Sequence, residues 1–316
     1  MPILTVRHVT TYRYLQPVSF GEHRMMFRPR DSYDQRLLTS ALVIAPEPVS
    51  IRWVHDVFGN CVAFARFAGR ARELRFESTI RLEHTPSHAP DFQLEEYAET
   101  YPFTYGAEDM PDLLRSIERH APDPQRDVNR WARRFLRRDG ATNTRELLAS
   151  MTHAIRQDFT YVAREEKGIQ NPAQTLRLGS GSCRDFALLM MEAVRSLGMA
   201  ARFVSGYLYT PKHDASSTGR MAPRVGGGAT HAWLQVYLPG AGWVEFDPTN
   251  GIVGNRDLIR VAVVRDPKQA IPLSGTWIGF PADNLGMTVA VTVSAADDGE
   301  EAPPAGRGRA AVPHAR

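Results

Sequence analysis

Three side chains that together could perform nucleophilic catalysis lie in the second half of the chain, each at the edge of a predicted regular element. Cys183 opens a helical pattern, and His231 and Asp247 lie on two short strand patterns that follow it. A thiol, an imidazole and a carboxylate are the parts of a nucleophile, its general base and the group that orients the base. The three residues are therefore candidates for thiol catalysis.

The segment around Cys183 has the pattern of a capped, half-buried helix. Apolar residues of one helical face follow Ser182: Phe186, Leu189, Met190, Ala193, Val194 and Leu197. Ser182 with Asp185 resembles a capping box, and Gly198 predicts the helix end. Cys183 then occupies the first helical position, where unpaired N–H groups and the helix dipole favour a thiolate. A buried structural cysteine explains this segment alone about equally well.

His231 and Asp247 are predicted to lie on the two strands of one hairpin. One register makes the apolar faces of these strands coincide, pairing Val236 with Val244 and Leu234 with Phe246. In that register His231 and Asp247 are diagonal neighbours on the other face, roughly 7–8 Å apart, within reach of an imidazole–carboxylate hydrogen bond. A lone strand histidine is more often a packing residue, and a lone aspartate more often a turn residue. The diagonal match is what favours the catalytic interpretation.

The cysteine content argues against a disulfide framework and a structural zinc site. The chain has two cysteines, Cys61 and Cys183, and no C-x-x-C pair. We interpret Cys61 as a small strand residue without a function. A catalytic metal is the other use for a Cys, His and Asp set, but His213 is the only obvious further ligand, so thiol catalysis is favoured and no metal is predicted.

The overall composition is that of a soluble protein without a polyanionic partner. Lysine and arginine number 38 against 35 acidic residues, a net charge of +3, and 43% of residues are hydrophobic. This balance predicts neither nucleic acid nor membrane binding. The first residues lack the pattern of a signal peptide, and no apolar run has the length of a membrane span. We therefore expect a cytoplasmic protein.

The chain divides into regions by its periodicity. Residues 1–85 alternate like antiparallel strands, and residues 86–120 form a proline-rich acidic connector with one short helix near 113–120. Residues 121–294 begin with helical stripes, one of them capped at Asn143 or Thr144, and continue with strands. Residues 295–316 are predicted to be disordered. Together these patterns predict an α+β fold, in which the glycine-rich loop 212–228 beside the histidine strand could gate a substrate.

The three motifs, in this order and spacing, resemble those of the transglutaminase-like superfamily, specifically bacterial members with an N-terminal β region. The resemblance is carried by Gly-Ser-Cys-Arg-Asp-Phe-Ala at 181–187, Thr-His-Ala-Trp at 230–233 and Gly-Trp-Val-Glu-Phe-Asp-Pro-Thr-Asn at 242–250. It implies a papain-like core, a cysteine-bearing helix against an antiparallel sheet. It also implies that Cys183 is the nucleophile, His231 the base and Asp247 the group that orients the base.

The resemblance further implies acyl transfer through a thioester. The acyl group would come from a peptide bond or a glutamine side chain, and water or an amine would accept it. We expect a peptidase, amidase or acyltransferase acting on peptides or proteins, with hydrolysis favoured over cross-linking. No acidic calcium-binding loop is recognisable. We therefore do not expect the calcium activation known from other members of the superfamily, and we predict no cofactor. The alternatives are a non-catalytic protein-binding module on the same fold and a metal-dependent hydrolase.

Acyl transfer also calls for hydrogen-bond donors to the oxyanion. The backbone N–H of Cys183 is a natural first donor. Tyr161 and Gln170 are candidates for the second, although ordinary packing is slightly favoured for Tyr161, and Trp233 is a further candidate for contact with the oxyanion or the substrate.

Overall fold

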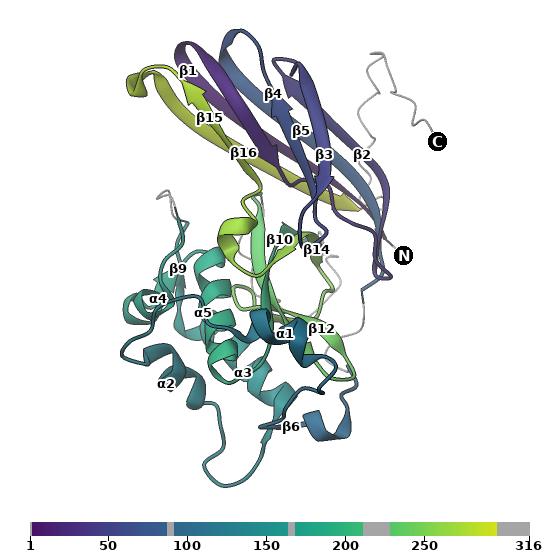
Figure 1. The fold of residues 1–316 in the computed structure, drawn as a ribbon, viewed down its shortest axis with the longest axis vertical. Coiled ribbons are helices and arrows are strands. Elements are labelled where there is room, and N and C mark those ends of the chain that lie inside the picture. The colour runs from purple at the N-terminus through teal and green to yellow at the C-terminus, as the bar shows by residue number, and fades with distance from the viewer. Residues whose placement is uncertain (1, 87–91, 164–167, 211–227, 296–316) are drawn as a thin grey trace, which may run out of the picture.

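The computed structural model describes residues 2–86, 92–163, 168–210 and 228–295. In these ranges the chain forms a seven-stranded sheet, a second sheet of five strands and a group of helices beside the second sheet (Figure 1). Both large sheets are antiparallel throughout. The predicted α+β class is confirmed.

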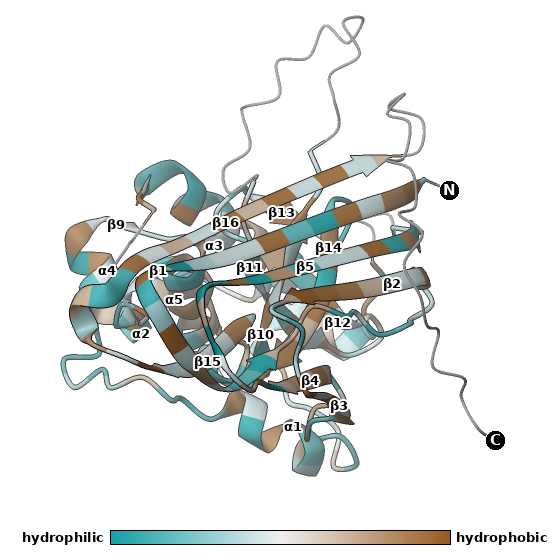
Figure 2. Ribbon diagram, turned by 90° about the horizontal axis from the view of Figure 1, so that it is seen from above, coloured by the Kyte–Doolittle hydropathy of each residue, from teal (hydrophilic) through white to brown (hydrophobic). Residues whose placement is uncertain are grey.

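The N-terminal half of the chain builds most of the seven-stranded sheet, as its alternating pattern predicted. Along β1 buried residues alternate with more exposed ones, and Figure 2 shows the matching change between hydrophobic and hydrophilic residues. The sheet order is β2-β5-β1-β4-β3, with these bounds: β1 Ile3–Met25, β2 Gln35–Ala45, β3 Ser50–His55, β4 Cys61–Arg66 and β5 Arg70–His84.

The last strands of the described chain return to this N-terminal sheet. Both β15 (Leu273–Ile278) and β16 (Asn284–Ala295) pair with β1 (Figure 1). Strand β16 is paired along most of its own length, with the first half of β1. The sequence analysis grouped these strands with the core region 121–294, and the structure differs. A strand pattern shows which residues alternate but not which distant edge they join, and here the partner lies more than 250 residues away in sequence. The tail predicted to be disordered lies outside the described residues beyond Ala295.

The connector contains the predicted short helix, which begins three residues earlier than expected, and in addition a 3₁₀ turn and a short strand. A 3₁₀ turn, η1 (Glu96–Ala98), leads into β6 (Thr100–Tyr101), which pairs with β7 (Thr142–Asn143). A two-turn helix, α1 (Met110–Ile117), follows, with a proline in its first turn, where no intrahelical N–H bond is lost.

The helices of the core follow the predicted apolar stripes. In chain order they are α2 (Asp127–Arg133), α3 (Thr144–Asp158), α4 (Pro172–Leu178) and α5 (Cys183–Ser196). The predicted cap of α3 is confirmed, because the side chain of Asn143 accepts a hydrogen bond of 3.0 Å from the N–H of Glu146. Helix α5 is buried along most of its length and lies at the centre of the largest hydrophobic cluster.

The second sheet presents one face to α5. Its order is β13-β12-β11-β10-β14, with these bounds: β10 Ala201–Leu208, β11 His231–Leu238, β12 Gly242–Asp247, β13 Ile252–Val253 and β14 Leu258–Val264. The predicted hairpin register is confirmed, since Leu234 pairs with Phe246 and Val236 with Val244. Two short parallel strands, β8 (Thr160–Tyr161) and β9 (Ser180–Gly181), and two 3₁₀ turns, η2 (Pro267–Gln269) and η3 (Pro281–Asp283), complete the described elements.

The two sheets share buried contacts. Leu4, Ile80 and Val291 of the N-terminal sheet pack with Tyr207 and Ile259 of the second sheet. Met26 and Val62 join the cluster that surrounds α5, so the N-terminal sheet supports the core directly. Within the described residues, no helix has the length and apolar character needed to cross a bilayer.

Candidate active site

The cysteine lies at the first turn of α5, held there by the buried carboxylate of Asp185. One carboxylate oxygen, Oδ2, accepts hydrogen bonds from the N–H of Ser182 at 2.9 Å and from its hydroxyl at 2.8 Å. The other, Oδ1, accepts one of 2.6 Å from the backbone N–H of Gln170. The predicted contact from Asp185 back to the helix cap is therefore present, and it fixes the backbone on both sides of Cys183. The Cys183 side chain is 7% exposed.

Replacing Asp185 by alanine should lower the free energy of unfolding by about 3 kcal/mol, because two backbone N–H groups would lose a charged acceptor in a buried setting. Urea unfolding followed by circular dichroism measures this change. Asp158→Ala, at the exposed end of α3, is the matched control and should stay within about 0.5 kcal/mol of the unmodified chain. Equal stabilities of the two variants would contradict the structural role of Asp185.

His231 and Asp247 form a hydrogen bond of 2.8 Å between Nε2 and Oδ2, with both side chains fully buried. The carboxylate is itself fixed by its neighbours. Its Oδ1 accepts from the N–H of Thr249 at 2.9 Å, and its Oδ2 also accepts from the side-chain amide of Asn250 at 2.8 Å. The imidazole ring is therefore held by an acceptor that cannot rotate freely.

The second ring nitrogen of His231, Nδ1, is available to the thiol of Cys183. Within the described residues Nδ1 is buried and has no conventional hydrogen-bond partner. Burial acts to lower the pKa of His231, but the charge and hydrogen bond of Asp247, and then the nearby thiol of Cys183, raise it to about 10. The pKa of Asp247 is lowered, because the charge and hydrogen bond of His231 outweigh burial. Since Asp247 occupies Nε2, Nδ1 is the ring nitrogen that is open to the Cys183 thiol.

Tyr161 lies next to the strand that leads into Cys183. It ends β8, and its parallel partner on β9 is Gly181. Burial, and then the negative groups Cys183 and Asp185, raise the pKa of Tyr161 to about 12, so its hydroxyl keeps its proton at neutral pH. A protonated hydroxyl near the thiol could donate to an oxyanion, which remains a prediction for this residue.

The side chains of Gln170 and Trp233 contact other residues of the site. The amide nitrogen of Gln170 donates to the Thr175 hydroxyl at 3.1 Å and to the Ser180 carbonyl at 2.9 Å, which uses both of its N–H bonds. Trp233 is fully buried and stacks on the imidazole of His231, with ring centroids 5.9 Å apart and an interplanar angle of 27°. In this arrangement Gln170 braces the loop before Cys183, and Trp233 supports the imidazole.

Three contributors were not assigned a role from the sequence. Thr249 and Asn250 bind Asp247, and the Asp-x-Thr spacing, which favours an Asx turn, was the available signal. Arg184 is half-buried and follows Cys183 in the sequence. It donates to the carbonyl of Pro267 in η2 at 2.7 Å, and its guanidinium lies 5.1 Å from the ring centre of Phe203. Its distant partners left no local signal in the sequence.

Both cysteines, Cys61 and Cys183, are free, so they do not form a disulfide with each other. Within the described residues, no three His, Cys, Asp or Glu side chains are arranged to hold one metal ion.

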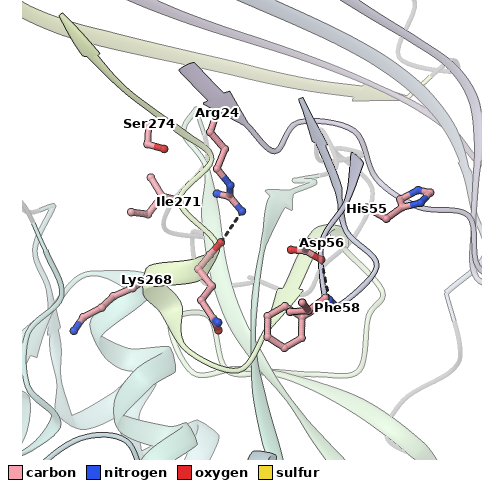
Figure 3. A pocket seen from close by; sticks show the side chains of 9 residues that line it. Arg24, His55, Asp56, Phe58, Lys268, Ile271 and Ser274 are labelled. Carbon is pink, nitrogen blue, oxygen red and sulfur yellow. Dashed lines mark hydrogen bonds between the residues drawn. The ribbon is translucent and has the colours of Figure 1, made fainter. Parts of the chain in front are cut away.

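Two clefts lie where the N-terminal sheet meets the core. The first has a volume of about 540 Å³ and lies between the β3–β4 turn, the end of β1 and η2 (Figure 3). In it Arg24 donates to the carbonyl of Gln269 at 3.2 Å. The second, of about 420 Å³, lies on the other side of Phe58, which lines both. Neither cleft is lined by Cys183, His231 or Asp247.

A cysteine-bearing helix packed on an antiparallel sheet that presents a paired histidine and aspartate defines a transglutaminase-like protein. Residues 4–83 match the family model of the bacterial transglutaminase-like N-terminal region, and residues 130–248 match that of the transglutaminase-like superfamily. The chain belongs to this superfamily, as the motifs predicted.

Similar proteins occur in mycobacteria. Protein ML0607 of Mycobacterium leprae is 27% identical over 290 residues, which covers 92% of this chain and 98% of the relative. Protein Rv2569c of Mycobacterium tuberculosis is 29% identical over 301 residues, or 91% of each chain. The crystal structure of a candidate cysteine protease from Cytophaga hutchinsonii superposes with a TM-score of 0.68 over 96% of this chain and 93% of that one, at 18% identity. That similarity shows a shared fold.

Proposed function

We propose that the protein is a thiol enzyme that transfers acyl groups from amide bonds, with Cys183 as nucleophile, His231 as general base and Asp247 as the orienting carboxylate. The observation that carries the proposal is the fully buried His231–Asp247 hydrogen bond of 2.8 Å, whose ring leaves Nδ1 to the thiol. A structural histidine would normally have both ring nitrogens satisfied.

The chemistry follows from where the protons lie. His231 takes the thiol proton, and the sulfur attacks the amide carbonyl carbon. The first N–H groups of α5 face the developing oxyanion. The imidazolium then protonates the leaving amine, and a thioester remains on Cys183. His231 takes a proton from water, the hydroxide attacks the thioester, and the acid and the free thiol are released.

We place hydrolysis ahead of cross-linking. Water needs no binding site of its own, whereas an amine acceptor must be held beside the thioester long enough to compete. A glutamine side chain and a peptide bond both fit the chemistry, because both present an amide carbonyl.

A peptide library, incubated with and without a primary amine and analysed by mass spectrometry, tests the proposal. We expect cleaved peptides that gain the mass of water, or glutamines that exchange ammonia for water. An amine adduct in place of water would identify transfer as the reaction. The absence of every product, with an alkylatable Cys183 in a folded chain, would contradict the proposal.

A non-catalytic binding module is the second candidate. The observation in its favour is that neither junction cleft reaches the buried Cys183. This candidate predicts peptide binding without turnover and without a thioester, so the same library separates the two.

A further inference from the structure

The second junction cleft contains a charged group without a counter-ion. It lies between the segment after β1, the β3–β4 turn and the hairpin of the second sheet, and its volume of about 420 Å³ is in the range of small-molecule sites. Gln235 lines it and alternates with Leu234 and Val236, which join the cluster around α5, so the cleft lies on the opposite face of the sheet.

Most charges in this cleft are neutralised by one another. Arg260 donates to Asp34 at 2.8 Å and to Glu245 at 2.6 Å. The Glu245 carboxylate also accepts from the side-chain amide of Gln235 at 2.7 Å. Asp31 accepts from the backbone N–H of Leu37. The carboxylates of Asp34, which lines the cleft, and of Glu245, which adjoins it through Arg260, therefore already have partners.

Arg202 is the exception. Its Nε donates to the side-chain oxygen of Gln235 at 2.7 Å, and its guanidinium lies 3.9 Å from the ring centre of Trp243. Its two terminal nitrogens make no hydrogen bond and no ion pair with any described residue, and Arg202 is one of the residues that line the cleft. Burial lowers the pKa of Arg202 to about 10 in spite of Glu245, so it remains a cation at neutral pH and lacks a direct partner.

The geometry of the Arg202 guanidinium favours a carboxylate as its ligand. A guanidinium that is fixed at Nε and stacked on an indole presents its outer N–H groups in a plane, which matches the two oxygens of a carboxylate. Arg30, Arg202 and Arg260 lie here with Asp31, Asp34 and the adjoining Glu245, so the charges balance overall and Arg202 is a cation whose terminal N–H groups have no acceptor among the described residues. A monoanion adds less negative charge beside Asp34 and Glu245 than a phosphate dianion does, so a carboxylate is the favoured ligand.

We propose that this cleft binds the carboxylate of a small organic acid or of a peptide C-terminus, with Arg202 holding the two oxygens and Trp243 and Val263 contacting the apolar part. The site is separate from the thiol, since Gln235 is four residues from His231 along β11, roughly 13 Å at 3.3 Å per residue. It touches both the N-terminal segment and the core hairpin.

Calorimetric titration of the full chain tests the site. The probes are benzoate, the isosteric uncharged benzamide, inorganic phosphate, and an acetylated dipeptide as its free acid and as its amide. We expect benzoate or the dipeptide acid to bind at least tenfold more tightly than the matching amide and more tightly than phosphate. Binding of both acids assigns the site to carboxylates in general, and binding of the dipeptide acid alone assigns it to a peptide C-terminus.

Variants connect that binding to Arg202. Arg202→Met should weaken it at least tenfold, while Arg13→Gln, on the exposed surface of β1, should leave it unchanged. If Arg202→Met does not fold, the indole N–H signal of Trp243 in the unmodified chain gives the second test, and it should shift with the acid but not with its amide. Equal binding of acid and amide, tighter binding of phosphate, or acid binding that survives in Arg202→Met would overturn the proposal.

Discussion

Replacing Cys183 by alanine should lower kcat for amide cleavage by at least about 10⁴-fold and remove the thioester altogether. The reason is that, in the proposed mechanism, the sulfur is the one atom of the site that forms a covalent bond with the substrate. Intact-mass spectrometry of the quenched reaction measures the thioester, and product formation from the peptides identified in the library measures kcat. The fold should persist, because the Asp185 contacts that hold the start of α5 do not involve the thiol.

Cys61→Ala is the matched control. Cys61 begins β4 in the N-terminal sheet, is a free cysteine like Cys183, and burial raises the pKa of its thiol. Iodoacetamide should therefore label Cys183 faster than Cys61, and the Cys61 variant should keep full activity. Unchanged turnover in Cys183→Ala, or a loss of turnover in Cys61→Ala, would contradict the assignment of the nucleophile.

The sequence was sufficient to predict the geometry of the hairpin that carries the base. The apolar alternation of Leu234 and Val236 admits little ambiguity, because a shift of one residue would expose the whole buried face. Once the register is set, the diagonal contact between His231 and Asp247 follows from strand geometry alone. The start of α5 was predictable for the same reason, since capping involves residues that are close in sequence.

What the sequence did not reveal depends on contacts between residues far apart in the chain. No local pattern links Arg184 to Pro267, and none links Asp34 to Arg260, although these pairs position the core helix and the N-terminal segment. The pairing of β16 with β1 is of the same kind. Local periodicity fixes the elements, while the choice among distant partners depends on the total burial that each arrangement achieves.

Polar neighbours of Asp247 hold its carboxylate in the position that the hydrogen bond with His231 requires. Both carboxylate oxygens accept bonds from the turn that follows, through Thr249 and Asn250, so the carboxylate is fixed before the imidazole contacts it. Without that turn, a charged group in a fully buried position would be costly. The site thus uses residues adjacent in sequence to hold the carboxylate, and the hairpin to bring the imidazole to it.

Asp247→Asn should therefore lower kcat by about 10²–10⁴-fold while KM changes little; the comparable change in a serine triad costs about 10⁴-fold. If the asparagine oxygen stays on the Thr249 N–H, its NH₂ group points at Nε2 of His231 and must donate to it. The imidazole then carries its proton on Nδ1 and cannot accept one from the thiol. Steady-state kinetics on a peptide from the library measure the effect, and Asn250→Ala, which removes one of the four bonds to Asp247, should cost far less.

The stability of the same variant provides an independent test with a defined pH dependence. The pKa of His231 is raised to about 10, so its stabilising contribution is complete below the unfolded value of 6.5 and is lost as the pH rises through about 10. The pKa of Asp247 is lowered, so its contribution is present above the unfolded value of 3.8 and is lost in acid. Urea unfolding of Asp247→Asn should show the largest deficit, a few kcal/mol, near pH 6 and a smaller one near pH 10. A deficit that does not vary with pH would mean that His231 and Asp247 do not form a charged pair.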